Sequence, residues 1–451
     1  MAETKKIKAI TMKIANILSV LLLALLSLPV YAVVPGIMTL HLPEHAIGPD
    51  NLAVIVAAGD PLSESIAAYY QSARGIPAEN IIYVPLKTGM DTISAADFAK
   101  LKARIDAKLP GNIQATLLTW MAPSRVAGPC AMSITSAMAF GYDPKYCTAG
   151  CTATRASPYF DSESATPWQD FAMRPSMMLG AVSLAAAKKL IDLGVKADAS
   201  FPSGEGYLLR TRDVARSVRY QEYLHLPGLW TGHLALNYID NSAGKRSDSI
   251  TNQSGVLFYF TGLISVPDIA SNTYLPGAIA DSLTSFGGYL PDGNGQMPVT
   301  KWLEAGVTAS YGMVAEPCNF VQKFSDAAVL IDHYYRGATL IEAYWKSVQW
   351  PGQGLFVGEP LAKPYRDRSA FFINNGRYVI TTRALRARSH YALEYFSFIS
   401  GDWHTLARFV LKRPQLQVLY APLPPADATQ IRWNGPCPAN LTKQCTLSNF
   451  Y

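Results

Sequence analysis

The feature that most constrains this fold is a series of continuous apolar runs of strand length, each bounded by turn residues. The clearest run is Asn51–Ala58 (NLAVIVAA), which a Gly-Asp-Pro turn follows. A strand without polar alternation is buried on both faces, which is typical of a parallel sheet. Asp60 is expected to cap a helix over 62–74, and Gly75 is expected to end it.

The same order repeats along the chain. We expect strands over 81–84 and 115–121, with a helix from Ser94 to Ala107 between them. Strand–helix–strand–helix–strand order predicts right-handed crossovers and a parallel α/β sheet with helices on both faces. Later strands are expected at 256–260, 307–313 and 354–357, and later helices at 214–224, 327–335 and 340–349.

Composition changes divide the chain into domains. Residues 122–203 are rich in Ser, Pro, Tyr and Cys, and we interpret them as an insertion that contains a strand and a helix over 176–193. After Tyr365 only short strand-like runs separated by turns remain. We therefore predict an α/β domain over 33–365 and a small β-rich module over 366–451, for which an immunoglobulin-like sandwich is one arrangement.

The first 32 residues have the pattern of an export signal. A basic start precedes the apolar run Ile14–Leu28, and Ala32 ends a small-residue cleavage pattern. An uncleaved anchor is the alternative, but the run is shorter than the ~20 residues that a membrane span needs. We expect cleavage after Ala32, no stable membrane span afterwards, and a periplasmic or extracellular bacterial location.

Charge limits the class of partner. The net charge is +6, and four lysines of the export signal contribute to it, so the remaining chain is nearly neutral. A nucleic-acid-binding protein needs a basic face. We therefore expect no nucleic-acid partner.

Six cysteines in an exported chain favour disulfide bonds. We expect Cys437 to bond Cys445. For the other four, a local Cys147–Cys151 bond is one pairing, and a bond from Cys130 to one of them is another; Cys318 then needs a partner or stays free. The Cys-x3-Cys spacing could also bind a metal, but no histidine lies near it. No metal and no cofactor are expected.

Several motifs in order carry a resemblance to a known fold. NLAVIVAAGDP, ATLLTW, GVLFYFTGL, GVTASYG and VGEPL resemble the catalytic domain of gingipain-like cysteine peptidases, which have the caspase fold and an immunoglobulin-like module after it. The resemblance implies a histidine at the end of one strand and a cysteine at the end of the next. Here Thr261 stands at the first place, and 278–285 offers Asp281, Ser282, Thr284 and Ser285 but no thiol.

Longer motifs resemble an uncharacterised family of exported bacterial proteins. They are CAMSITSAMAFGYD, RPSMMLG, LPGAIADSLTSFGG, GVTASYGMVAEPC and EAYWKSVQWPGQGLFVGEPLA, and the resemblance spans about residues 48–365. The family occurs in bacteria that have exosortase, a membrane enzyme thought to sort proteins with a C-terminal PEP-type tail. The resemblance implies a cell-envelope context and, as partners, envelope proteins or peptides of that sorting system.

Four residues are candidates for a rearranged catalytic site. Thr261, Asp281 and Ser282 follow from the resemblance, and Cys318 could act as a nucleophile if His333 approached it. The alternatives are a disulfide bond for Cys318, and capping or turn roles for the Asp and Ser side chains.

Four further residues are candidates for binding. Glu316 and Glu359 follow buried strands and could meet at one rim of the sheet, where paired carboxylates can do acid–base work. The alternative for Glu359, which precedes a proline, is binding to backbone amides. Arg125 and Arg174 lie in or near loops of the insertion and could hold an acidic ligand, as could Arg210 and Arg212. The alternative for these arginines is ion pairing with Asp143, Asp161 or Asp170.

Three function classes remain. The chain could be a non-catalytic binding or assembly protein of the envelope, a hydrolase with a rearranged site, or an accessory that recognises exosortase substrates. No phosphate-binding glycine loop and no Gly-x-Ser-x-Gly motif occurs in the sequence.

Overall fold

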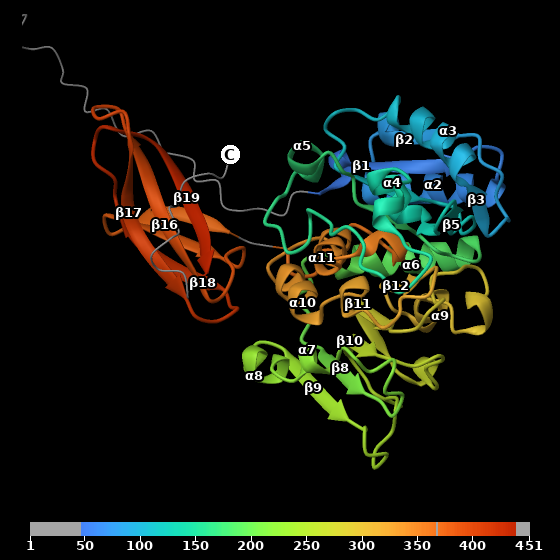
Figure 1. Cartoon of the computed structure of the whole chain (residues 1–451). Coiled ribbons are helices and arrows are strands. Elements are labelled where there is room, and N and C mark those ends of the chain that lie inside the picture. Colours follow the sequence, from blue (N-terminus) through green and yellow to red (C-terminus); the bar gives the residue numbers. More distant parts are fainter. Residues whose placement is uncertain (1–46, 367–368, 439–451) are drawn as a thin grey trace, which may run out of the picture.

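A computed structural model describes residues 47–366 and 369–438. It contains a ten-stranded sheet with helices packed on it and a separate β module at the end of the described chain (Figure 1). The expected export signal and the expected Cys437–Cys445 bond lie outside the described residues.

The first half of the large sheet begins with the two predicted crossovers. Asp60 accepts hydrogen bonds from the amides of Leu62 and Ser63, and Gly75 ends the helix in the left-handed region at φ 65°, as expected. Ser94 caps the next helix. The elements are β1 (Leu52–Ala57), α2 (Pro61–Arg74), β2 (Ile81–Val84), β3 (Thr92–Ser94), α3 (Ala95–Asp106), β4 (Ala115–Leu118), β5 (Arg125–Ala127), β6 (Met132–Ser133), α4 (Ile134–Phe140), α5 (Pro167–Phe171), β7 (Ser176–Met178) and α6 (Leu184–Ala197).

The second half contains strands that the sequence did not reveal. β8 and β9 were missed. β9 mixes polar and apolar residues at the edge of the sheet, and the buried run of β8 spans only 206–209, between Glu205 and Arg210. The elements are β8 (Glu205–Arg210), α7 (Tyr220–Tyr223), α8 (Leu226–Trp230), β9 (Ala235–Asp240), β10 (Val256–Thr261), β11 (Tyr274–Ser282), α9 (Thr300–Ala305), β12 (Ala309–Met313), α10 (Ala327–Tyr335), α11 (Leu340–Ser347) and β13 (Gly354–Gly358).

The sheet consists of two parallel blocks that run in opposite directions. Its order is β2-β1-β4-β7-β13-β12-β11-β10-β8-β9, and every neighbouring pair is parallel except β12–β13. The sheet is therefore mostly parallel rather than wholly parallel. As a consequence, the residues that follow β12 and the residues that follow β13 lie at opposite ends of the strands.

Two local predictions differ from the structure. Residues 122–203 are more than an insertion at the rim, because β7 lies between β4 and β13 within the sheet. The helix predicted over 214–224 is only the short α7. The Ser217 hydroxyl accepts the Thr211 amide and contacts its hydroxyl at 2.8 Å, and such side-chain bonds compete with helix formation.

The C-terminal module is all-β, as expected. It has two antiparallel three-stranded sheets, β14-β15-β18 and β17-β16-β19, which enclose their own apolar core around Ile380, Tyr391 and Leu393. The strands are β14 (Ala370–Asn374), β15 (Arg377–Thr382), β16 (Ser389–Ser397), β17 (Trp403–Leu411), β18 (Gln417–Pro422) and β19 (Ala428–Pro438).

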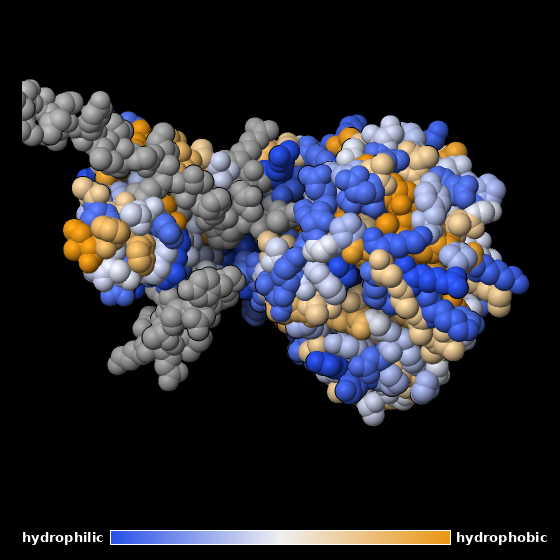
Figure 2. All heavy atoms as spheres, turned by 90° about the horizontal axis from the view of Figure 1, so that it is seen from above, coloured by the Kyte–Doolittle hydropathy of each residue, from blue (hydrophilic) through white to orange (hydrophobic). Residues whose placement is uncertain are grey.

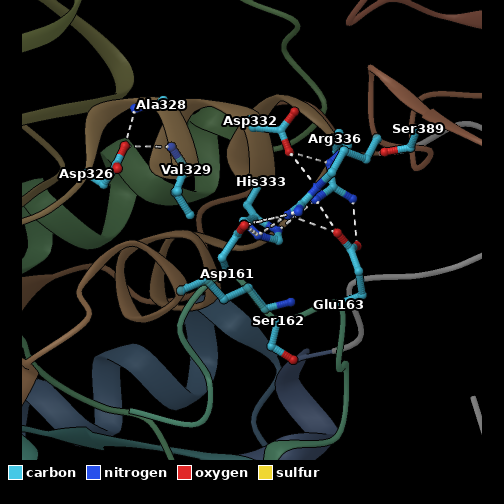
Figure 3. A network of polar contacts seen from close by, with 12 residues as sticks. Asp161, Ser162, Glu163, Asp326, Ala328, Val329, Asp332, His333, Arg336 and Ser389 are labelled. Atoms are coloured by element: carbon cyan, nitrogen blue, oxygen red, sulfur yellow. Dashed lines mark hydrogen bonds and ion pairs between the residues drawn. The ribbon is translucent and has the colours of Figure 1, made fainter. Parts of the chain in front are cut away.

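An ionic network joins this module to the α/β domain (Figure 3). Arg336, which directly follows α10, donates two hydrogen bonds to the Glu163 carboxylate and one to the Ala384 carbonyl. Arg386 lies 2.6 Å from Asp161 and 3.0 Å from Glu163. The loop at 161–163 thus binds arginines from both parts of the chain.

Candidate functional site

The ends of β10 and β11 bring three predicted residues together. These strands are parallel neighbours, and their register places Phe260 beside Asp281 and Thr261 beside Ser282. The two positions at which the resemblance expects a His/Cys dyad are therefore adjacent. All three candidate side chains are covered: Thr261 is 1% exposed, Asp281 0% and Ser282 6%.

Residues 211–219, which we call the cover segment, pack over these strand ends. The cover segment follows β8, the strand beside β10. Gly262 allows the close approach, because a Cβ at that position would overlap the Arg216 carbonyl. The Thr211 hydroxyl donates to the Gly262 carbonyl at 2.8 Å. A glycine directly after β10 therefore lets the polypeptide cover the site.

Arg219, at the end of the cover segment, forms a buried ion pair with Asp281. Arg219 Nη2 lies 2.7 Å from Asp281 Oδ1, and both side chains are 1% exposed. The same nitrogen donates to the Thr261 carbonyl at 2.8 Å, and Ser325 donates to Asp281 Oδ2 at 2.6 Å. The carboxylate raises the pKa of Arg219 against the opposing effect of burial, so the guanidinium stays charged.

Several buried polar atoms in and beside this ion pair lack hydrogen-bond partners among the described residues. Glu222 Oε2, the Tyr223 hydroxyl and Arg219 Nε are buried without a hydrogen bond among the described residues. Burial and the nearby Asp326 carboxylate raise the pKa of Glu222 to about 8. Glu222 is therefore held largely protonated near neutral pH, in a site where a second negative charge would be costly.

The chemistry available to the predicted nucleophiles is limited by their contacts. The Ser282 hydroxyl accepts the Leu263 amide at 3.0 Å and donates to the Leu263 carbonyl at 2.9 Å. The Thr261 hydroxyl is buried and has no hydrogen-bond partner in the described chain. A general base for either hydroxyl would need to lie within hydrogen-bond reach. The Ser282 hydroxyl binds only backbone groups, which is a structural role at the end of a strand.

Cys318 is bonded rather than free. Its disulfide partner is Cys151, and Cys130 bonds Cys147. The local Cys147–Cys151 pairing is therefore wrong, and the alternative through Cys130 is confirmed. With its sulfur in a disulfide, Cys318 offers no thiolate. His333 instead contacts Asp161 and Arg336, so it is not a partner of Cys318.

Glu316 and Glu359 do not meet. Because β12 and β13 are antiparallel, the residues that follow each strand lie at opposite ends of the strand pair. Glu316 is exposed and accepts the Cys318 amide at 2.9 Å. Glu359 is fully buried, where it accepts from the Tyr70 hydroxyl and the Arg74 guanidinium. The expected shared rim is wrong, and the expectation assumed that both strands ran in the same direction.

The candidate arginines also have partners within the chain. Arg125 donates to Thr92 at 2.8 Å and stacks on Tyr289. Arg174 is 6% exposed, lies 3.4 Å from the Trp168 ring and donates to the Ile113 carbonyl. Neither forms the alternative ion pair with Asp143, Asp161 or Asp170. Arg210 and Arg212 pair instead with Asp240 and Asp248.

A solvent-accessible groove lies elsewhere, beyond the end of β2. It has a volume of about 480 Å³, and its walls come from the β2 exit, β3 and α3. Lys87, Lys100 and Arg104 contribute positive charge, against Asp97 alone. Asp97 pairs with Lys100 at 3.1 Å, whereas Lys87 and Arg104 have no ion pair within the part of the chain that the structure describes. We call this the cationic groove.

The sequence did not single out Arg219, Glu222, Ser325 or the cationic groove. One signal was present: Asp281 directly follows the apolar run at 278–280, and a buried carboxylate requires a cationic or hydrogen-bonding partner. That requirement does not identify the partner, because Arg219 is 62 positions away in the sequence. Only the adjacency of β8, β10 and β11 brings it there.

Comparisons with protein families, with curated proteins and with solved structures find no match to this chain. Within 47–366 and 369–438, no group of three or more metal-ligating side chains occurs. No helix over the same ranges is long and apolar enough to cross a membrane.

Proposed function

We propose that this chain is an exported cell-envelope binding protein, built on a caspase-like scaffold that lacks the His/Cys dyad and linked to exosortase-type protein sorting. Two disulfide bonds support export, because such bonds persist in oxidising compartments. The resemblance of the long motifs to an exosortase-associated family supports the sorting context.

The single observation that carries the non-catalytic assignment is the buried Arg219–Asp281 pair. It occupies the strand ends at which a caspase-like enzyme would hold its nucleophile and base. The cover segment and Ser282 form internal hydrogen bonds beside the pair, and Thr261 is buried there. A substrate that approached these residues would first have to displace a buried ion pair.

The cationic groove supports the binding part of the proposal. Its volume falls within the range of small-ligand and peptide pockets. It lies at the carboxyl end of a strand in a parallel block, which is where open α/β sheets present ligand sites. Apolar side chains such as Ile93 and Leu101 line it beside the cations. We infer that it takes an acidic peptide segment that also carries apolar side chains.

The catalytic question is tested with a peptide library derived from a bacterial proteome. The purified protein is incubated with the library, and new termini are counted by mass spectrometry, with Ser282→Ala as the matched variant. We expect no new termini above those of heat-denatured protein. Cleavage that wild type shows and Ser282→Ala lacks would establish the hydrolase alternative instead.

The binding question is tested by fluorescence anisotropy with a labelled peptide that carries an acidic PEP-type motif. We expect saturable binding that Lys87→Glu/Arg104→Glu weakens by about tenfold or more, since each lost charge contact contributes on the order of 1 kcal/mol. Lys196→Glu/Lys245→Glu makes the same change of net charge elsewhere on the surface and serves as control. Equal binding by both double variants would exclude the groove.

A further inference from the structure

The β module carries exposed apolar side chains at one end, within the turn that connects β16 and β17. Phe398 is 77% exposed and Ile399 is 82% exposed, and both lie in the β16–β17 connection. The Ser397 amide donates to the Asp402 carbonyl at 3.0 Å, and the Gly401 amide donates to the Ser397 carbonyl at 2.9 Å, so Phe398 and Ile399 lie within the turn. Small polar residues are the usual choice at such positions. The turn therefore does not require two adjacent large apolar side chains there.

Two other connections bring apolar side chains to the same end. β15 pairs with β18 at Arg377 and Pro422, so the β14–β15 and β18–β19 connections start side by side. The Phe398 amide donates to the Asp427 carbonyl at 3.0 Å, which places the β16–β17 connection beside them. Ile373 is 53% exposed and Leu423 is 41% exposed. We call Ile373, Phe398, Ile399 and Leu423 the distal tip.

The distal tip points away from the α/β domain. The module contacts that domain through Arg383, Ala384 and Arg386, which precede β16. β16 then runs for nine residues, about 30 Å, to the other end of the module. Figure 2 shows hydrophobic residues gathered on the part of the module farthest from the α/β domain.

An aromatic collar lies directly behind the tip. Trp403 is opposite Phe396 in the β16–β17 pair, with their rings 5.5 Å apart. The Arg432 guanidinium stacks on the Trp403 ring at 3.9 Å. Both aromatic rings are partly exposed. In a bilayer the apolar acyl chains lie inside, and the interface above them favours tryptophan and arginine side chains. The exposed apolar groups of the tip, with Trp403 and Arg432 behind them, follow the same order.

We propose that the distal tip inserts into the outer layer of a lipid bilayer and docks the protein on a membrane surface. The tip is a convex end of a sandwich formed by three loops, so it suits a deformable partner better than a rigid one. Burial of Phe398 and Ile399 from water supplies the driving force. The exposed Arg377 then lies at headgroup depth, where it would favour anionic lipids, whereas Arg432 is paired with Glu394 at 2.9 Å. This inference does not depend on the proposed binding function of the cationic groove.

The test uses protein recovered after export and unilamellar vesicles of phosphatidylcholine, with and without phosphatidylglycerol. Flotation measures the bound fraction, and we expect Phe398→Ser/Ile399→Ser to lower the vesicle partition coefficient by about tenfold or more. Val410→Ser, at the opposite end of the same sheet and 55% exposed, is the matched control and should bind as wild type does.

A local measurement separates the tip from any other lipid-binding part of the chain. Hydrogen exchange with mass spectrometry should show slower exchange over 397–402 and 423–427 when vesicles are added. Flotation that the double variant leaves unchanged, or exchange over these ranges that vesicles do not alter, would overturn the proposal. Vesicle-independent self-association that the double variant abolishes would assign the tip to a second copy of the chain and would also overturn it.

Discussion

Arg219 and Asp281 form an ion pair 2.7 Å long between side chains that are each 1% exposed, at the strand ends where the sequence resemblance expects a catalytic dyad. The pair joins the cover segment to β11, and both side chains also contact Ser325, the residue that precedes the Asp326 cap of α10. Its removal should therefore affect the stability of the fold rather than a reaction.

Asp281→Ala should lower the free energy of unfolding by about 3–5 kcal/mol, because it leaves a buried guanidinium without its counter-ion. Urea denaturation followed by circular dichroism measures the change. Arg219→Met/Asp281→Leu should recover much of the loss, since a well-packed apolar pair can replace a buried ion pair. If Asp281→Ala unfolds at the wild-type urea concentration, the pair is not structural.

Glu222 should make stability depend on pH. Its pKa rises from 4.5 to about 8 on folding, so the folded state binds more protons than the unfolded state between these values. Stability contributed by the protonated carboxyl is therefore complete below about pH 4.5 and is lost as the pH rises to about 8. Melting curves across this range should show the loss in wild type and a flatter profile in Glu222→Gln. Identical profiles would show that Glu222 does not carry the effect.

Gly262→Ala should displace the cover segment, because the added methyl overlaps the Arg216 carbonyl. Overpacking of this kind costs about 1–3 kcal/mol. Gly111→Ala is the control, since a Cβ there meets nothing within 4 Å and the change should stay within about 0.5 kcal/mol. Faster amide exchange over 211–219 in Gly262→Ala alone would locate the disturbance, and equal melting temperatures for the two variants would contradict it.

The Cys151–Cys318 bond joins residues 167 positions apart. Cys151→Ser/Cys318→Ser should lose about 2–4 kcal/mol of stability, chiefly through the unfolded state. Thiol labelling of native protein with peptide mapping should find no reactive sulfur at Cys318. A fast-reacting Cys318 would instead reopen the possibility of a thiol nucleophile.

Glu163→Gln should loosen the C-terminal module, because Arg336 and Arg386 both bind this carboxylate. The loss of charge-assisted hydrogen bonds should cost about 2 kcal/mol. Small-angle X-ray scattering should report a larger radius of gyration for this variant. Glu304→Gln, which breaks an exposed pair with Lys301, should leave the scattering curve unchanged. Unchanged curves for both variants would show that the network does not hold the module.

Local sequence signals predicted much of the first half of the fold. The Asp60 cap, the Gly75 stop and the apolar runs at β1, β2 and β4 depend on interactions within a few residues, and the structure confirms each. The helix predicted over 214–224 was wrong because the Thr211–Ser217 hydrogen bonds and the packing against Gly262 outweigh helix propensity. β9 was missed because this edge strand mixes polar and apolar residues, and β8 because its buried run spans only 206–209.

The sequence by itself determined that buried parallel strands, an all-β end and paired cysteines would be present, because periodicity, turn residues and composition act locally. It also placed Thr261 and Ser282 at the ends of adjacent strands through a resemblance. Only the tertiary structure decided which groups meet. The antiparallel pairing of β12 and β13 separates Glu359 from Glu316, and the adjacency of β8, β10 and β11 brings Arg219 to Asp281. Contacts between distant residues depend on strand order and direction, which no local pattern encodes.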